Sequence, residues 1–560
     1  MKKVFDFLDD RTGYRKLLAH ALDEPIKGGS RWLYVFGSVL LGMFVVQAVT
    51  GVALMTSYAP SETTAWASVH YIQFTQSGGW LVRGLHHFGA QAMVILLAAH
   101  MLQVAAFGAY RKPREVTWWL GLSLLGLVLG FALTGYLLPW DQKGYWATRV
   151  ATNIAGTVPI VGAATQKLAQ GGPEYGSLTL TRFYALHVGV LPALVVFLVT
   201  AHVALFRKHG VTPAAKADLS KVESFHPAQL AKDVFATVFV LGIVLVFAIR
   251  EHGAPLDAPA DPSSDYPARP EWYFLGLFQL LKYFHGPLEV VGTVGLPTVV
   301  GLYLFALPFL DRAPTTALRG RIKAVAPLGI IALGVTLLTV QAIRDDARDE
   351  AFKKQRDKAT ELATTANRLA MGGVPPAGPL VMMNQSWELK GPLLFDKHCA
   401  GCHTLRDHGV EKDRTAPKLD GWGTEAWALS MLKDPDADDR FGRTFYKGEM
   451  KPIEKDREVI AHFLASQEKG SPGEQMVKTR CTTCHTYGGE GDDSATGLAP
   501  ELDGWGTQEW LKAQILNPAT KKTYRENALD LDRKGHMPRF DDEMSPDDAD
   551  RLARWILSLR

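Results

Sequence analysis

Apolar residues gather in seven long runs within the first 343 residues of this 560-residue chain. A helix of about 20 apolar residues is long enough to cross the hydrocarbon core of a membrane. The pattern therefore predicts an all-α, polytopic membrane region with about seven transmembrane helices, of which the fifth is the shortest. The runs cover residues 32–55, 79–107, 116–139, 183–206, 234–249, 290–310 and 324–343.

Positive charge alternates between the segments that connect these runs. Lys and Arg are frequent before the first run and in the loops after the second, fourth and sixth runs, whereas residues 60–79 contain neither. Because positively charged loops stay in the cytoplasm, we expect a cytoplasmic N-terminus and no cleavable signal. An odd number of spans then places the C-terminal part on the periplasmic, outer side of a bacterial cytoplasmic (inner) membrane.

The chain becomes charged after the seventh run. A predicted charged helix and a Pro/Gly-rich linker occupy residues 344–390. An internal repeat follows, because residues 417–435 and 500–518 share the pattern Pro-x-Leu-Asp-Gly-Trp-Gly-Thr. The repeat predicts two small α-helical domains, at residues 391–469 and 470–560.

All four cysteines of the chain lie in two Cys-x-x-Cys-His motifs, one in each repeat. This motif attaches c-type haem: the thiols bond the porphyrin, and the histidine takes one axial position on the iron. A zinc site is the alternative, but zinc prefers four nitrogen or sulfur ligands in a closed tetrahedron. The motifs comprise Cys399, Cys402 and His403, and Cys481, Cys484 and His485.

A methionine further along each repeat is expected to be the sixth iron ligand, which raises the reduction potential. We select Met450, in the run Gly-Glu-Met-Lys-Pro, and Met537, in His-Met-Pro. Met431 is the alternative in the first repeat, although its helical position also suits core packing.

Four histidines lie in two apolar runs with matched spacings. His86 and His100 are 14 residues apart, and His187 and His202 are 15 apart. Because about 14.4 residues make four helical turns, both members of each pair face one side, about 21 Å apart. Two such helices side by side would offer an imidazole pair for one haem at each of two depths. A single membrane histidine more often bonds to a neighbouring helix, and His87 is interpreted in that way.

The first 343 residues resemble the cytochrome b of Rieske/cytochrome b (bc-type) quinol oxidoreductases. The resemblance implies a four-helix di-haem part at residues 1–215 and a three-helix part, similar to subunit IV of photosynthetic b–f complexes, at 216–343. The tail resembles tandem class-I cytochrome c. The residues that carry the resemblance are the four histidines, Arg83, Arg182, Lys112-Pro113-Arg114-Glu115, the run GYLLPWDQ at 135–142 and Pro270-Glu271-Trp272-Tyr273.

The resemblance implies two non-covalent b haems. His86 with His187 would hold the outer, low-potential haem, and His100 with His202 the inner, high-potential haem. Arg83 and Arg182 would contact the haems. In the photosynthetic type an additional haem is attached to a cysteine in the first span, but the matching position here is Val35, so we expect no such haem.

The resemblance also implies two quinone sites. Glu271 and Tyr273, with Tyr136 and Gly144 nearby, would line the outer quinol-oxidation site. The same proline and carboxylate are also ordinary signals for the start of a helix. The implied residues of the inner quinone-reduction site are Arg207, Lys208 and Asp233, of which Asp233 is either the proton entry or a helix cap.

The implied function is that of a quinol–cytochrome c oxidoreductase subunit with two b haems and two c haems, which translocates protons. Expected partners are a separate Rieske iron–sulfur protein, the quinone pool, and a cytochrome c or terminal oxidase as acceptor. We also expect a homodimer of the complex. The net charge of +3 gives no sign of a nucleic-acid partner. The alternative is a non-bifurcating, membrane-anchored haem relay between another oxidoreductase and a soluble carrier.

Overall fold

The computed structural model describes residues 2–491, 499–524 and 536–560, in two compact units, Met1–Leu380 and Val381–Arg560. The described residues include seven helices long and apolar enough to cross a membrane, which confirms the predicted number. The fifth, expected at 234–249, is longer than its apolar run. The spans are Phe36–Met55, Gly79–Phe107, Glu115–Leu137, Ser177–His209, Phe225–Arg250, Val291–Leu310 and Leu318–Arg348.

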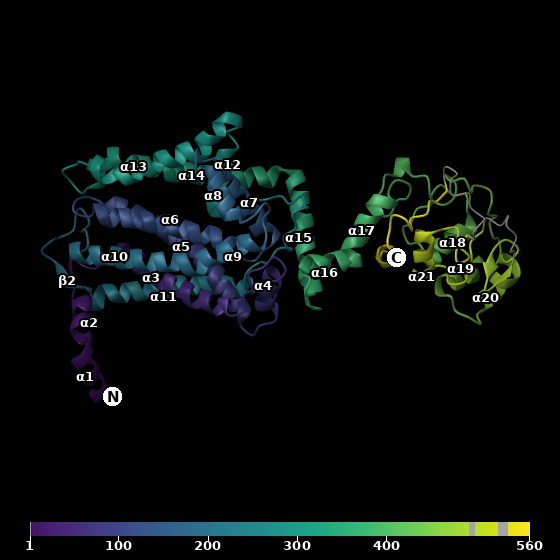
Figure 1. The fold of residues 1–560 in the computed structure, drawn as a ribbon, viewed down its shortest axis with the longest axis horizontal. Helices are drawn as coiled ribbons and strands as arrows, with labels where there is room; N and C mark the ends of the chain where they lie inside the picture. The colour runs from purple at the N-terminus through teal and green to yellow at the C-terminus, as the bar shows by residue number, and fades with distance from the viewer. Residues whose placement is uncertain (1, 492–498, 525–535) are drawn as a thin grey trace. The chain divides into compact units, whose positions relative to one another are not determined.

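The first four spans form a helical bundle (Figure 1). Helix α3 (Phe36–Met55) packs along α5 (Gly79–Phe107), and α6 (Glu115–Leu137) packs along the fourth span. That span consists of α9 (Ser177–Ala185), the π-helical turn η2 (Leu186–Val190) and α10 (Leu191–His209). A π turn inserts one extra residue into a helix. It therefore offsets the 15-residue spacing of His187 and His202, so that both face the bundle as His86 and His100 do.

The remaining spans cover this bundle. Helix α11 (Leu230–Arg250) packs on α3 and α5, α13 (Leu296–Leu310) contacts α6, and α12 (Leu275–Leu281) packs on α14 (Ile322–Arg348). A two-stranded ribbon of β1 (Pro25–Lys27) and β2 (Val222–Ser224) joins the N-terminal segment to the entrance of α11. Shorter helices are α1 (Lys2–Thr12), α2 (Tyr14–Leu22), α4 (Ala65–Phe74), α7 (Gln142–Gly156) and α8 (Gly162–Gln170).

The charged segment after the last span is a helix that stays with the membrane unit. Helix α15 (Glu350–Ala370) begins at Asp349, whose carboxylate accepts the Phe352 amide. Its Asn367 carbonyl lies 3.0 Å from His70 Nε2 on α4, and its amide donates to the Leu256 carbonyl. The contacts hold α15 against α4 rather than leaving it free.

The second unit contains both Cys-x-x-Cys-His motifs around one apolar core. Its helices are α16 (Pro379–Gln385), α17 (Trp387–His398), α18 (Glu425–Lys433), α19 (Arg457–Ser466), α20 (Pro472–Met476), α21 (Gln508–Leu516) and α22 (Pro546–Ser558), with short strands β3 (Thr486–Tyr487) and β4 (Glu490–Gly491). The first helix of the first repeat, α17, packs on the last helix of the second, α22. Helix α19, which ends the first repeat, packs on α20, which begins the second.

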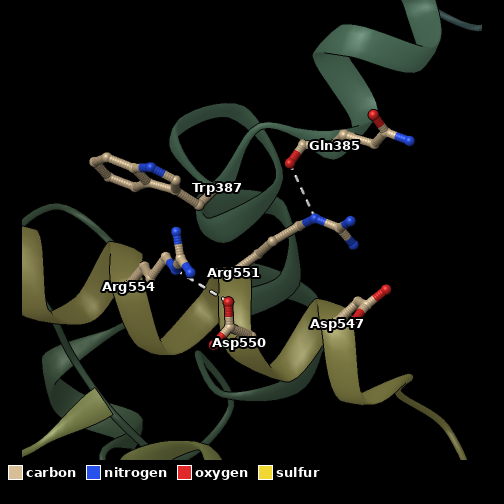
Figure 2. A pocket seen from close by; sticks show the side chains of 6 residues that line it. All are labelled: Gln385, Trp387, Asp547, Asp550, Arg551 and Arg554. Atoms are coloured by element: carbon tan, nitrogen blue, oxygen red, sulfur yellow. Dashed lines mark hydrogen bonds and ion pairs between the residues drawn. The ribbon is translucent and has the colours of Figure 1, made fainter. Parts of the chain in front are cut away.

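Figure 2 shows this crossing from close by. Arg551 on α22 donates to the Gln385 carbonyl at 3.0 Å, and Arg554 lies beside Trp387 at the start of α17. Residues 166 positions apart in the sequence are therefore neighbours. The helices of the two repeats therefore pack against each other in one compact unit.

A buried ion pair joins α5 to the connection between the last two spans. Arg321 donates to the Asp311 carboxylate at 2.8 Å, to the Ala105 carbonyl at 2.7 Å and to the Tyr110 hydroxyl at 2.8 Å. Tyr110 in turn donates to Asp311 at 2.7 Å. Arg321 is 1% exposed, so its charge depends on these partners.

We expect Arg321→Met to destabilise the membrane unit by about 3–5 kcal/mol, because it removes the cation that donates to the buried Asp311 carboxylate and leaves only the more distant Arg111, at 3.9 Å. The measurement is thermal unfolding of the purified chain, followed by b-haem absorbance. Arg319→Met is the matched control, since Arg319 is exposed on the same short helix. Adding Asp311→Leu should restore part of the loss; an Arg321→Met chain as stable as the control would contradict the role of the pair.

Candidate haem and quinone sites

The outer histidine pair faces across the bundle. His86 on α5 and His187 in η2 have ring centres 6.3 Å apart, with the rings at 70°. A metal–imidazole bond is about 2 Å long, so an iron midway would separate the ring centres by about 6 Å. The observed spacing fits one six-coordinate iron between the two imidazoles.

The hydrogen bonds of this pair fix which ring nitrogen is free. Thr50 donates its hydroxyl proton to the Val46 carbonyl at 2.6 Å, so its oxygen accepts from His86 Nδ1 at 3.0 Å. Thr134 likewise donates to Gly130 and accepts from His187 Nδ1 at 3.0 Å. Metal-binding histidines are commonly held in this way through the second nitrogen. Each Nε2 is left with a lone pair for iron.

The inner pair, His100 and His202, lies about four helical turns away on the same two spans. Both Nδ1 atoms are buried, and neither has a hydrogen-bond partner among the described residues. Histidines buried inside a membrane bundle are costly and usually functional, which supports a role for this pair. In the described part of the chain, no group of three or more His, Cys, Asp and Glu side chains would hold a bare metal ion. Two imidazoles at each level suit a porphyrin iron, whose other four ligands come from the ring.

Four glycines, which the sequence analysis did not select, lie against the four histidines. A Cβ on Gly51 or Gly135 would lie 3.3 or 2.6 Å from Cε1 of His86 or His187, respectively. At the inner level, a Cβ on Gly37 or Gly121 would lie 3.5 Å from Cε1 of His100 or His202. Each glycine pair is 14 residues apart, on α3 and on α6. The signal was therefore present in the sequence, as a second set of residues with the spacing of the histidines.

The hydrogen bonds of Arg83 and Arg182 in the described structure go to groups other than the four histidines. Arg83 is buried and donates to Gln73 at 2.8 Å, to the Pro255 carbonyl at 2.7 Å and to the Ala254 carbonyl. Arg182 donates to the Leu168 carbonyl. Arg83 holds the loop after α11 and Arg182 holds helix α8, and contact with haem stays a prediction for both.

The run Pro-Trp-Asp-Gln, residues 139–142, is joined by hydrogen bonds to two other segments of the chain. The Asp141 carboxylate accepts from the Gly144 amide at 2.8 Å and from the Asp257 amide at 3.3 Å, so it caps α7 and holds the following segment. Burial and the nearby Asp257 charge raise the pKa of Asp141 to about 6. The Trp140 carbonyl accepts from the Ala260 amide at 3.0 Å. These bonds fix the segment that leads to Glu271.

Glu271 and Tyr136 both lie near Lys143, and their place in a quinol-oxidation site stays a prediction from the resemblance. Lys143 Nζ is 3.1 Å from Glu271 Oε1 and 5.7 Å from the centre of the Tyr136 ring. The Tyr136 hydroxyl is buried without a partner among the described residues. Burial, and then the charge of Glu271, raise the pKa of Tyr273. Like the four glycines, Lys143 is a residue that the sequence analysis did not select.

A chain of hydrogen bonds joins this motif to α5. Trp272 donates to Gln91 Oε1 at 3.3 Å, and Gln91 Nε2 lies 2.9 Å from His87 Nε2. His87 follows His86 directly but points to the outer motif. The bond from His87 to Gln91 lies within α5 and not between helices, so the structural role expected for His87 stays a prediction.

At the inner end, Asp233 is joined to two polar partners. Ser38 donates to Asp233 Oδ2 at 2.7 Å, and Gln229 donates to Oδ1 at 2.8 Å. Asp233 is 5% exposed. Arg207 instead pairs with Glu24 at 3.2 Å, and Lys208 is exposed. The structure thus links Asp233 to α3, and the inner-site roles of Arg207 and Lys208 stay predictions.

In both Cys-x-x-Cys-His motifs, a backbone carbonyl fixes the orientation of the histidine ring. His403 Nδ1 donates to the Pro417 carbonyl at 2.8 Å, and His485 Nδ1 donates to the Pro500 carbonyl at 2.9 Å. Carbonyls only accept, so each ring carries its proton on Nδ1 and has its lone pair on Nε2, the form that binds iron. Burial lowers the pKa of His403, which favours the neutral, ligating form.

The three candidate methionines all contact the core of the second unit. Met431 is buried in that core, whereas Met450 and Met537 are partly buried against it. Met431 lies on α18 among packed side chains, as a core residue does. The selection of Met450 over Met431 as an iron ligand stays a prediction.

We expect Gly135→Val to prevent binding of the outer b haem while the inner b haem is retained, because a side chain there would overlap His187. The matched control is Gly126→Val on the same helix, where a Cβ would meet no heavy atom within 4 Å. Redox-titrated optical spectra of the purified chain resolve the two haems. Equal haem content in both variants would show that the glycine does not shape the site.

Family models and relatives agree with this geometry. The cytochrome b(N-terminal)/b6/petB model matches residues 91–259, and the cytochrome b(C-terminal)/b6/petD model matches 259–352. The cytochrome c model matches twice, at 389–468 and 471–560. Cytochrome b and cytochrome c domains imply haem b and haem c, respectively.

Among similar proteins, the cytochrome bc complex cytochrome b subunit of Chlorobaculum thiosulfatiphilum is 35% identical over 346 residues, which are 61% of this chain and 78% of the relative. Cytochrome b6 of Synechococcus sp. (strain JA-3-3Ab) is 38% identical over 212 residues, which are 38% of this chain and 99% of the relative. A solved structure titled hyperthermophilic respiratory Complex III superposes with a TM-score of 0.54 at 27% identity, covering 65% of this chain and 97% of the other. The chain belongs to the cytochrome b family of cytochrome bc-type complexes and carries two cytochrome c domains at its C-terminal end.

Proposed function

We propose that this chain is the haem-carrying core of a proton-translocating quinol–cytochrome c oxidoreductase. It oxidises quinol at the outer site and reduces quinone at the inner site. The supporting observation is the cluster of Tyr136, Lys143 and Glu271, which begins one residue from the glycine that faces His187. A carboxylate at that place accepts a proton from quinol while an electron leaves towards the adjacent haem position.

The residues of the outer cluster have distinct tasks. Lys143 holds the Glu271 carboxylate in place through the 3.1 Å contact, and the Tyr136 hydroxyl, which has no partner among the described residues, is available to bond the quinol ring oxygen. Asp141 and Arg83 hold the segment that precedes the motif. Haem bound to the histidine pairs would carry single electrons across the membrane.

The inner site takes up protons for quinone. Asp233 is buried, and Ser38 and Gln229 occupy its two oxygens with hydrogen bonds. This arrangement fits a carboxyl that passes a proton inward along polar side chains. We assign Arg207 and Lys208 to the surface that attracts protons and quinone to this end.

The complex requires further partners. Every cysteine lies in a Cys-x-x-Cys-His motif, so none remains for a Rieske cluster. A separate Rieske protein would take one electron from quinol and pass it to the c haems, and a cytochrome c or terminal oxidase would accept it. We place the chain in a bacterial inner membrane, as a homodimer, with its N-terminus in the cytoplasm and its cytochrome c domains outside.

The test is oxidant-induced reduction of the b haems, in purified complex with quinol and an inner-site inhibitor. Adding an oxidant to the c side should make the b haems more reduced, because quinol splits its two electrons. If the b haems become oxidised together with the c haems while a Rieske protein is present, the non-bifurcating relay is correct instead.

We expect Glu271→Gln to slow quinol oxidation by about 10²-fold, because the amide accepts no proton at the outer site. Steady-state turnover and the rate of oxidant-induced b-haem reduction measure the effect. Glu251→Gln is the control, since Glu251 is exposed at the end of α11 and pairs only with its neighbour Arg250 in the described structure. Turnover of Glu271→Gln equal to that of the control would remove Glu271 from the mechanism.

We expect Asp233→Asn to leave the first turnover of quinol oxidation intact but to slow re-oxidation of the b haems by quinone. The amide keeps the hydrogen bond from Ser38 but does not carry a proton. Stopped-flow absorbance separates the two phases. Asp218→Asn, on the exposed loop before α11, is the control. Unchanged re-oxidation would assign Asp233 the helix-cap role alone.

A further inference from the structure

The helix pairs of the second unit cross between the two sequence repeats. A Cβ on Gly391 of α17 would lie 2.3 Å from Cβ of Trp555 on α22, and a Cβ on Gly473 of α20 would lie 2.5 Å from Cβ of Phe463 on α19. Helices approach this closely only where a glycine removes the side chain between them. The same close packing thus occurs twice, each time between one repeat and the other.

The residue before each Cys-x-x-Cys-His motif also contacts the other repeat. His398 Nδ1 is 3.4 Å from Glu543 Oε2, and Arg480 donates to Asp456 Oδ2 at 2.8 Å. Glu543 is six residues after Met537, and Asp456 is six residues after Met450. Each attachment motif therefore touches the loop that follows the methionine of the other repeat.

A ring contact supports the first of these pairings. The His398 and Phe540 rings have centres 5.5 Å apart, and Phe540 is only three residues after Met537. The first attachment motif thus lies beside the chain that carries Met537. On the other side, Arg480 also donates to the Lys455 carbonyl at 3.4 Å, close to Met450.

The segment that follows each methionine forms a hydrogen bond to a helix of its own repeat. The Ile453 amide donates to Leu432 on α18 at 2.8 Å, and the Phe540 amide donates to Leu516 on α21 at 2.8 Å. Helix α18 packs on α19, and α21 packs on α22. Gln514 of α21 also lies 3.3 Å from Met537 Sδ. Because α19 and α22 each pack on a helix of the other repeat, the methionine segments joined to them also lie towards the other repeat.

The two Asp-Gly-Trp-Gly turns lie where the repeats cross. Trp422 and Trp505 have ring centres 5.4 Å apart. Gly421 and Gly504 have φ of +67° and +72°, a backbone conformation that residues with a side chain rarely adopt. In each repeat the chain passes from the attachment motif, through this turn, to α18 or α21. The turns thus redirect the second half of each repeat.

We propose that the two axial methionines are exchanged between the repeats. Met537 is the sixth ligand of the haem attached to Cys399, Cys402 and His403, and Met450 is the sixth ligand of the haem attached to Cys481, Cys484 and His485. The proposal rests on the histidine–methionine ligation in the proposed function and changes only which methionine serves which haem.

The test uses the full chain with one c haem removed. Cys481→Ser with Cys484→Ser leaves only the haem on the first motif. In this background we expect Met537→Ala to abolish the near-infrared methionine–iron charge-transfer band and to lower the reduction potential. Met450→Ala, the matched control, should keep both. Loss of the band with Met450→Ala and its retention with Met537→Ala would establish pairing within each repeat and overturn the proposal.

The reciprocal background provides an independent test. With Cys399→Ser and Cys402→Ser, the band should depend on Met450 and not on Met537. Covalent haem, stained on a denaturing gel, shows that each variant has matured. Met537→His in the first background retains a strong ligand, so it should add a further bis-histidine signal to those of the two b haems if Met537 serves the c haem. A signature unaltered by Met537→His would overturn the exchange.

A parent chain with a single c haem and no methionine–iron band would refute methionine ligation itself. That result would overturn the ligand set of the proposed function, and with it the exchange. A band in the parent that responds to the wrong methionine would refute the exchange alone. The two failures are therefore distinguishable in the same series.

Discussion

The placement of imidazoles across a bundle of apolar helices is the constraint on which the membrane unit depends. A planar, six-coordinate group needs two facing rings and space on both sides. His86 and His187 supply the rings at 6.3 Å, and Gly51 and Gly135 leave space where a Cβ would meet them. Because four helical turns separate the two levels, one pair of helices repeats this arrangement at a second depth. The other spans cover the pair and exclude water from it.

Buried polar side chains at both ends of the bundle hold the loops that connect its helices. At the outer end, Arg83 bonds three acceptors and Asp141 bonds two amides, so the segment before Glu271 has little freedom. At the inner end, Arg321 bonds Asp311 and carbonyls of α5. In a low-dielectric environment an unpaired charge is costly, so each of these networks rigidifies the loops it joins. Rigid loops suit sites where proton acceptors must lie within hydrogen-bond reach of a substrate.

Sequence patterns predicted the number of spans, the histidine levels and the attachment motifs, because each depends on local periodicity or a short motif. The 15-residue spacing of His187 and His202 was accepted as about four turns, but the structure explains it by the π turn at Leu186–Val190. The glycines opposite the histidines also have a 14-residue spacing, but glycine is common in membrane helices, so this spacing alone does not distinguish them. Lys143 could not be predicted, since its partner Glu271 lies 128 residues away and no local pattern joins them.

The crossing of the cytochrome c repeats marks a different limit. Gly391 and Gly473 occupy equivalent places, and Phe463 and Trp555 are both aromatic residues on closing helices, so the sequence fits either pairing equally well. Pairing within a repeat would leave each domain able to fold alone. Pairing between repeats makes the core of each half depend on the other, and the contact of Trp422 with Trp505 lies between them. The unit that folds is then the pair, and the two haem positions are held at a fixed separation by shared helices instead of by a linker. For an electron relay such a separation is useful, since the distance between two carriers would not vary with the motion of a hinge.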